Sequence, residues 1–271
     1  MKEHNARFEK GLETFDVELN KFADLDRFEF KALYTGLKKK SITKDCTGSV
    51  DLVDNLPSSV DWTDKAVNPV RNQGMCGSCW AFSAAGALEG LSAISAGKTN
   101  VFSTQQLVDC AGGEYENEGC NGGEMDSAFR YVIDNGITTD SQYPYTAKDQ
   151  KCAYTSAMKV FQNSRCAEVP ANKTKYLASA VSKQPVAIAV EADQISFQFY
   201  RSGVFSGNCG TDLDHGIVLT GYGNLNGKDF WRCKNSWGAS WGLNGYILIE
   251  KTDADGPGKC GIMMENAVPL A

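Results

Sequence analysis

The chain has 271 residues, 42% hydrophobic and 22% charged, which is typical of a globular protein and excludes long disorder. Its net charge of −6 argues against a nucleic-acid partner, and no apolar run is long enough for a membrane span. Ten cysteines and only two histidines disfavour a zinc site and favour disulfides made in an oxidising compartment. Because the first residues are not an apolar signal sequence, we expect that the chain lacks its leader.

Residues 1–55 are dense in charge and contain no proline. Phe30, Leu33 and Tyr34 follow the i, i+3, i+4 spacing of a short amphipathic helix. Residues 41–54 show no periodicity, which predicts an exposed linker open to proteolysis.

The remaining residues divide into a helical half and a strand-rich half. Helices are predicted over residues 78–91, 103–108 and 125–135, the last ending at Gly136 in a left-handed cap. Strands are predicted over residues 186–190, 217–220, 230–233 and 246–249. This order predicts an α+β protein with two lobes and a substrate cleft between them.

The segment Gln73-Gly-Met-Cys76-Gly-Ser-Cys79-Trp carries the strongest local signal. A Cys-x-x-Cys pair can act in redox chemistry or bind zinc, but a loop rather than a strand precedes it, and no second such pair completes a zinc site. Cys79 is expected at the start of the Ala-rich helix, where the helix dipole favours a thiolate. We therefore interpret Cys79 as a nucleophile.

His215 and Asn235 are the candidate partners of this thiol. A lone histidine can equally be a core residue with satisfied hydrogen bonds, and asparagine in a loop is usually a turn residue. An amide oxygen on the imidazole N–H would, however, fix the tautomer of His215, as in a catalytic triad. Trp237 could shield that hydrogen bond from water.

Together these residues resemble the papain family of cysteine peptidases. The matching motifs, in the family's order, are Gln73-Gly, Cys76-Gly-Ser-Cys79-Trp, Gly119-Cys-Asn-Gly-Gly123, Asp214-His215-Gly, Lys234-Asn-Ser-Trp-Gly238 and Trp241-Gly. The resemblance implies a two-lobed papain-like α+β fold, with a helical left lobe, an antiparallel β-barrel right lobe and the active site in the cleft. It also implies hydrolysis of polypeptide substrates through a thioester acyl-enzyme, without metal or organic cofactor.

The resemblance assigns roles to single residues. Cys79 is implied as the nucleophile, His215 as the acid and base, and Asn235 as the group that orients the imidazole. Gln73 would form an oxyanion hole with the backbone N–H of Cys79. The pair Gly122-Gly123 resembles the main-chain edge that binds an extended substrate.

The resemblance also implies a pocket for the second substrate residue before the cut. Its implied walls are Met125, Ala189, Asp214 and Gly216, with Glu265 at the floor. The small walls leave room for Phe or Leu, and Glu265 could pair with Arg. The alternative is a Glu265 that always faces solvent.

The implied disulfides are Cys76–Cys120, Cys110–Cys152 and Cys209–Cys260. Cys46 falls in the leading residues, and Cys166 and Cys233 do not match the family pattern. An extra bridge needs Cα atoms within roughly 7 Å, and we favour buried thiols for Cys166 and Cys233.

Residues 1–55 resemble the end of a cathepsin L-type propeptide, and residues 56–271 resemble the mature peptidase. His4-Asn5 resembles the end of an inhibitory helix that is mostly absent, and Asn20-Lys-Phe-Ala-Asp24 resembles the second propeptide motif. The chain is therefore interpreted as a zymogen whose own propeptide inhibits it while running opposite to substrate. The mature part has one histidine, so the paired-histidine loop of cathepsin B-like exopeptidases is missing and endopeptidase action is expected.

We expect a monomer in a lysosome or vacuole, or a secreted one. The sequon at Asn172 predicts a surface loop that is glycosylated on a eukaryotic secretory route. Two alternatives remain. One is a catalytically silent binder or inhibitor, and the other is a disulfide oxidoreductase using Cys76 and Cys79, which fails if Cys76 is bridged to Cys120.

Overall fold

The computed structural model describes residues 1–38 and 46–271, so residues 41–45 of the predicted linker lie outside the described part. In the rest of that linker Cys46 is buried, and residues 47–54 are exposed or half-buried. The helices are α1 Lys2–Glu9, α2 Arg27–Tyr34, α3 Cys79–Ala96, α4 Thr104–Cys110, α5 Met125–Asn135, α6 Thr174–Lys183 and α7 Ile195–Gln198. The strands are β1 Phe15–Val17, β2 Val60–Asp61, β3 Arg165–Glu168, β4 Val186–Val190, β5 Tyr200–Phe205, β6 His215–Leu225, β7 Lys228–Lys234, β8 Tyr246–Glu250 and β9 Asn266–Leu270. Short 3-10 turns are η1 Gly113–Tyr115, η2 Gly119–Asn121, η3 Ser156–Met158 and η4 Lys259–Gly261.

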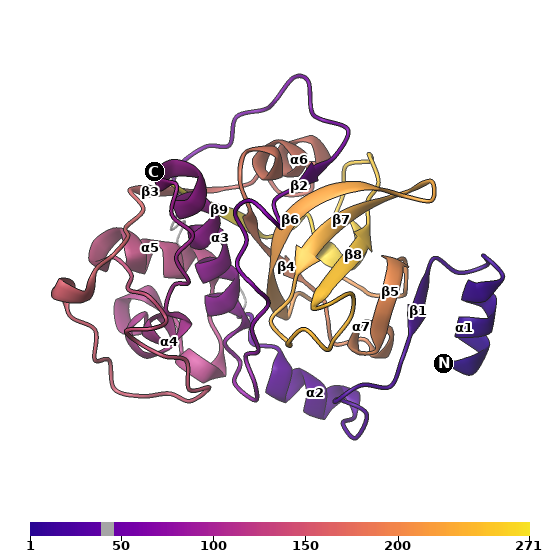
Figure 1. Cartoon of the computed structure of the whole chain (residues 1–271), viewed down its shortest axis with the longest axis horizontal. Coiled ribbons are helices and arrows are strands. Elements are labelled where there is room, and N and C mark those ends of the chain that lie inside the picture. Colours follow the sequence, from indigo (N-terminus) through magenta and orange to yellow (C-terminus); the bar gives the residue numbers. More distant parts are fainter. Residues whose placement is uncertain (39–45) are drawn as a thin grey trace.

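Helices α4 and α5 lie on one side of the molecule and the sheet lies on the other, with α3 between them (Figure 1). The sequence-based helices at 78–91, 103–108 and 125–135 and the four expected strands correspond to α3, α4, α5, β4, β6, β7 and β8. Gly136 does end α5 with a positive φ of 80°, but its ψ of 178° is extended, so the expected left-handed helical cap is wrong.

The strand lobe is not the closed antiparallel barrel that the resemblance implied. Its described strands follow the open order β1-β5-β8-β7-β6-β4-β9-β3, with β2 paired to β6. The β5–β8 pair is parallel, because the chain passes through the β6–β7 hairpin between these two strands and no tight turn sets their direction. Strands β1 and β3 therefore lie at the two edges of the sheet and do not pair with each other.

Helix α3 positions the beginning of the site because it packs very closely on the sheet. It is buried from Cys79 to Ser92. A Cβ on Gly86 would lie 2.6 Å from the Val218 side chain, and one on Gly90 would lie 2.6 Å from the ring of Pro185. Glycine at these two points lets the helix axis approach β4 and β6 more closely than a larger residue would allow.

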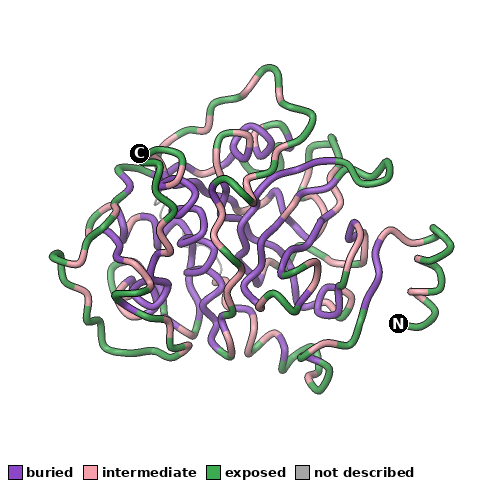
Figure 2. Tube along the Cα trace, in the orientation of Figure 1, coloured by how far each residue is buried: buried purple, intermediate pink, exposed green. Residues whose placement is uncertain are grey.

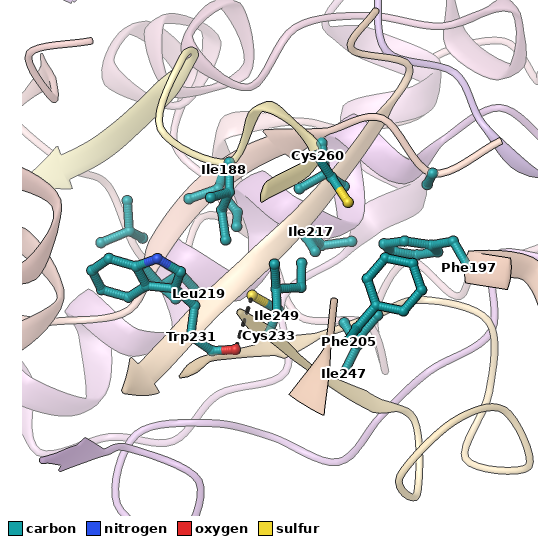
Figure 3. Packing of buried hydrophobic residues seen from close by; sticks show 14 of the residues in the cluster. Ile188, Phe197, Phe205, Ile217, Leu219, Trp231, Cys233, Ile247, Ile249 and Cys260 are labelled. Atoms are coloured by element: carbon teal, nitrogen blue, oxygen red, sulfur yellow. Dashed lines mark hydrogen bonds between the residues drawn. The ribbon is translucent and has the colours of Figure 1, made fainter. Parts of the chain in front are cut away.

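The larger hydrophobic cluster fills the strand lobe and includes Phe197, Phe205, Ile217 and Trp231 (Figure 3). Cys233 lies in this cluster as a buried free thiol, as we favoured. A second cluster fills the helical lobe with Trp80, Leu88, Phe102 and Phe129 among its members. Each lobe therefore has a core of its own, with α3 facing both.

The leading segment contributes to the first of these cores. Phe22 and Phe30 are completely buried in it, whereas Phe28 is 79% exposed. Phe28 lies on the outer face of α2, two positions from Phe30. Strand β1 pairs antiparallel with β5 and so adds the leading segment to the edge of the sheet.

Four disulfides are present in the described chain. Cys76–Cys120, Cys110–Cys152 and Cys209–Cys260 are the three that the resemblance implied. The fourth joins Cys46 to Cys166, so the expectation of a free thiol at Cys166 is wrong. The reason is that Thr47 and Gly48 pair with Ala167 of β3, which brings the two Cα atoms to 4.8 Å.

Candidate active site

Cys79 is the first residue of α3 and is completely buried. The main chain of Gly216 hydrogen-bonds its thiol, so the sulfur lies beside the residue that follows His215. Burial raises the pKa of the Cys79 thiol to about 12, although this backbone hydrogen bond acts in the opposite direction.

His215 begins β6 and Asn235 follows the end of β7, and the antiparallel pairing of these strands brings the two residues together. His215 Nε2 lies 2.8 Å from Asn235 Oδ1. The imidazole stacks on the buried Trp237 ring, with centroids 4.6 Å apart, so the indole shields this hydrogen bond. Burial lowers the pKa of His215 to about 4, against the effect of Asn235.

Gln73 is buried and is held by two contacts within the main body. Its Oε1 accepts a hydrogen bond from Ser236 Oγ at 2.6 Å, and its Nε2 donates to the carbonyl of Cys76 at 3.0 Å. The same Nε2 lies 3.1 Å from the carbonyl oxygen of Tyr34, which also accepts from Trp237 Nε1 at 3.1 Å. The Tyr34 carbonyl of the leading segment therefore accepts the hydrogen bond that Gln73 is expected to donate to a substrate carbonyl.

The Gly122-Gly123 edge also carries the leading segment. Gly123 donates to the carbonyl of Gly36 at 2.9 Å and accepts from the Lys38 amide at 3.1 Å, in a parallel pairing. A Cβ on Gly123 would lie 2.8 Å from the Trp80 ring, so glycine is required here for reasons of packing.

Residues expected to line the specificity pocket meet where β4 ends and β6 begins. Ala189 pairs with Gly216, and a Cβ on Gly216 would lie 3.1 Å from Met125 Sδ. The carbonyl of Glu265 accepts from the Ala189 amide at 3.0 Å, which brings this half-buried residue next to the pocket wall. Leu37 of the leading segment packs against the cluster that contains Met125 and Ala189.

Sequence reasoning missed a group of charges beside the site. Lys31 Nζ lies 2.9 Å from Asp193 Oδ2 and 3.3 Å from Asp214 Oδ2, and Arg27 Nη2 lies 2.9 Å from Asp193 Oδ1. Burial and Asp193 raise the pKa of Asp214 to about 7, in spite of Lys31. Burial acts in the same sense on Asp193, but Lys31 and Arg27 outweigh it and hold its pKa below the ordinary value. The acidic residues were visible in the sequence, but nothing in it paired them with Lys31.

The remaining sequence-based expectations concern the sequon, a metal site, a membrane span and the Cys-x-x-Cys pair. Asn172 is exposed in the loop before α6. Within residues 1–38 and 46–271, no group of His, Cys, Asp and Glu side chains could hold a metal ion. No helix in these ranges has the length and apolar character needed to cross a membrane. Cys76 is bridged to Cys120, so the oxidoreductase alternative fails.

Comparisons with known proteins agree with this geometry. The profile of the family described as "Papain family cysteine protease" matches residues 56–270. Oryzain beta chain of Oryza sativa subsp. japonica is 47% identical over 272 residues, and the match covers 98% of this chain and 58% of that protein. Senescence-specific cysteine protease SAG39 of the same rice is 46% identical over 272 residues, covering 97% of this chain and 79% of the relative.

The solved structure of digestive procathepsin L 3 from Tenebrio molitor larval midgut is similar over the whole chain. The TM-score is 0.91 at 39% sequence identity, and the match covers 100% of this chain and 87% of that one. Since the leading segment is included in this match, its likeness to a proform extends beyond residues 56–270. With the matched profile, the shared residues and the geometry of Cys79, His215 and Asn235, the chain belongs to the papain family of cysteine proteases.

Proposed function

We propose that this chain is the proform of a cysteine endopeptidase that cuts polypeptides through a covalent thioester. One observation carries the proposal: three distant segments bring together Cys79 at a helix start, His215 and the Asn235 oxygen bonded to its ring. The intact set also argues against a catalytically silent binder.

In the proposed reaction, the Cys79 thiolate attacks the substrate carbonyl, and the negative oxygen is stabilised by Gln73 Nε2 and the Cys79 backbone N–H. His215 then gives its proton to the leaving amine, which departs and leaves the thioester. The same imidazole takes a proton from water in the second half of the reaction. Asn235 keeps the ring in one tautomer and orientation.

Residues 1–55 act in this proposal as an inhibitor, and their direction follows from two contacts. In a substrate, the pocket residue precedes the residue whose carbonyl enters the oxyanion hole. Here the Tyr34 carbonyl lies on Gln73, and Leu37, later in the chain, packs at the pocket. The segment therefore runs opposite to substrate, and no carbonyl of it is presented for attack in the substrate orientation.

The inhibitor also controls charge. While it covers the site, burial favours a neutral thiol and a neutral imidazole. Its departure admits water, and we propose that Cys79 and His215 then form the thiolate–imidazolium pair.

Autoprocessing tests the whole proposal. We expect acid-incubated wild type to release residues 1–55, as measured by mass spectrometry, and to cleave peptides with a bell-shaped pH dependence set by the pair. Cys79→Ala or His215→Ala should remove most of the activity, and Asn235→Ala considerably less. Near-normal turnover in His215→Ala would contradict the mechanism. Binding without cleavage in wild type would favour the inhibitor alternative.

Substrate choice is proposed to depend on the pocket at Met125, Ala189 and Gly216. We expect peptides with Phe-Arg before the cut to be cleaved best, because a buried Phe side chain contributes about 1.5–3 kcal/mol. Arg-Arg peptides should be cleaved through a pairing with Glu265 that weakens as pH falls. Glu265→Ala should reduce only Arg-Arg cleavage; equal loss on both peptides would show that the pocket floor lies elsewhere.

The setting of the enzyme is proposed to be a vacuole, a lysosome or the extracellular space, where its four disulfides are stable. We propose a monomer with a glycan at Asn172. A gel mobility unchanged by glycosidase would count against the glycan, and a sedimentation mass above that of one chain would count against the monomer.

A further inference from the structure

Two carboxylates of the main body, Asp193 and Asp214, pair with cations of the leading segment, Lys31 with both and Arg27 with Asp193. The side chains of Asp193 and Asp214 are only 3% and 6% exposed. Lys31 Nζ contacts both, and it lies 3.5 Å from the exposed Asp212. Lys31 belongs to α2 in the leading segment, so its removal leaves this group without that cation.

The main body itself holds the carboxylates in place. Asp214 Oδ1 accepts a hydrogen bond from the Ala192 amide at 2.8 Å, whereas Oδ2 has Lys31 as its only ion-pair partner in the described chain. When the leading segment leaves, the two carboxylates lose Lys31 and Arg27, and a cationic side chain in their place restores the charge-assisted pairing. The occupied lysine position therefore shows which side chain the group accepts.

The β4–β6 register and the direction of the leading segment place this group on one side of the cut. Ala189 pairs with Gly216 at the pocket for residues before the cut, and Val190 pairs with His215. Asp214, which the resemblance counted among the pocket walls, directly precedes His215, and Asp193 lies three residues after Val190. The leading segment runs opposite to substrate, and Lys31 precedes Tyr34, whose carbonyl lies on Gln73. Lys31 therefore takes the place of a substrate residue that follows the cut. Substrate residues that follow the cut bond are therefore expected to pass Asp193 and Asp214.

We propose that Asp193 and Asp214, with Asp212 at the rim, form a subsite for a Lys or Arg side chain in the first or second substrate residue after the cut. The subsite rests on the proposed peptidase activity. Charge-assisted pairing with two buried carboxylates favours such a residue over a neutral one of equal length.

The test uses the processed enzyme and quenched fluorescent peptides that are identical before the cut. The two positions after it carry, in turn, Arg, Lys, citrulline or Glu. We expect kcat/KM for Arg and Lys to exceed that for citrulline at least tenfold, and Asp193→Asn to reduce this ratio to near one. Asp212→Asn, which changes an exposed side chain, should reduce it by a smaller factor.

The matched control is Asp253→Asn. The Asp253 carboxylate pairs with Lys251 and takes no part in the proposed subsite, so this variant should leave the ratio unchanged. Equal kcat/KM for Arg and citrulline in wild type, or a ratio retained in Asp193→Asn, would overturn the subsite. Cleavage of no peptide at all would instead overturn the proposed activity, so the two failures are distinguishable.

A second, independent observation is the bridge between Cys46 and Cys166. It joins the leading residues to β3 of the main body, and both cysteines are buried. Gly48 N–H also donates to the carbonyl of Cys166 at 2.9 Å. A backbone cut after Cys46 would therefore separate the chain but leave residues 1–46 attached.

We infer that release of the inhibitor needs two covalent steps, a peptide cut between Cys46 and Leu56 and reduction of this bridge. The reductant is a low-molecular-weight thiol: two of its thiols give up two electrons and two protons and form a disulfide. Cys46 and Cys166 take these up and become free thiols. Until then, the tethered segment competes with substrate at an effective concentration of about millimolar.

The full chain is processed in acid without thiol and measured by intact mass before and after reduction. We expect one covalently linked species before reduction and two separate chains after it. The Cys46→Ser/Cys166→Ser double variant should separate without thiol, as seen by gel filtration, which does not depend on the state of Cys79. Separation of wild-type fragments without thiol, or a mature N-terminus before Cys46, would overturn the inference.

Discussion

The two parts of the leading segment hold the main body in different ways. Residues 1–17 form α1, which buries no residue, and β1, which adds to the sheet edge at β5 (Figure 2). Residues 22–37 bury Phe22 and Phe30 completely and insert Tyr34 and Leu37 into the site. The first part is attached through main-chain pairing and the buried side chains of Phe15 and Val17, and the second through aromatic packing around Trp237.

The difference indicates where inhibition originates. Phe22 and Phe30 contact the Trp237 ring edge-on, with centroids at 5.6 and 5.1 Å, and Trp237 in turn stacks on His215. Burial of large aromatic side chains contributes more free energy than a few exposed hydrogen bonds. We therefore expect residues 22–37 to provide most of the inhibition, and residues 1–17 to orient the chain that enters it.

The largest expected effect concerns the thiol that the second part covers. With the pKa of Cys79 at about 12, the thiolate fraction in the proform is very small at neutral pH and rises with pH. Alkylation by iodoacetamide should therefore increase roughly tenfold per pH unit between pH 7 and 10 in the proform. The processed enzyme should react more than a hundredfold faster at pH 7, with little pH dependence there. Equal rates in the two forms would contradict the proposed charge control.

The next largest effect is expected for Phe30→Ala. Removing a fully buried phenylalanine costs about 3–5 kcal/mol, and here that cost falls on the docking of α2. The rate of peptide cleavage by the uncut proform should increase roughly a hundredfold or more. Phe28→Ala is the matched control, because Phe28 is exposed on the same helix and should have little effect.

A smaller effect is expected for Asp26→Ala. The Asp26 carboxylate caps α2 by accepting from the amides of Phe28 and Glu29, and the Asp26 amide donates to Glu29 Oε2. Loss of such a cap costs about 1 kcal/mol, or roughly fivefold in the activity of the uncut chain. Asp26→Asn should restore inhibition, since Asn is an equally good cap; failure to do so would point to charge rather than capping.

The smallest effects are expected for the polar contacts of residues 1–17. Asn5 bonds both the amide and the carbonyl of Val17, at 3.1 and 2.7 Å, so Asn5→Ala should raise the activity of the uncut chain only two- to fivefold, for about 0.5–1 kcal/mol. Arg7→Ala, which breaks the exposed pair with Glu13, should change nothing measurable. An Arg7→Ala effect as large as that of Phe30→Ala would reverse our ranking of the two parts.

Short-range sequence patterns were sufficient to predict the elements that such patterns specify. Strand β4 and helix α5 have the predicted bounds, because an apolar run and an amphipathic period identify them. Strands β1 and β5 were missed, since their short sequences acquire strand structure by pairing with distant segments, β1 with β5 across some 185 residues and β5 also with β8. The closed barrel was wrong for a related reason, because strand order depends on which edges meet.

By itself the sequence determined the family, because its motifs are patterns of residue types at short spacing. The catalytic candidates, three disulfides and the likeness of the leading residues to an inhibitory propeptide were implied by that resemblance. Tertiary structure alone decided the Cys46–Cys166 bridge, the position of Lys31 between Asp193 and Asp214, and the exposure of Phe28. These depend on distances between residues that are far apart in the chain or on which face of a helix turns inward. Such distances are set by the packing of whole elements, and no local spacing encodes them.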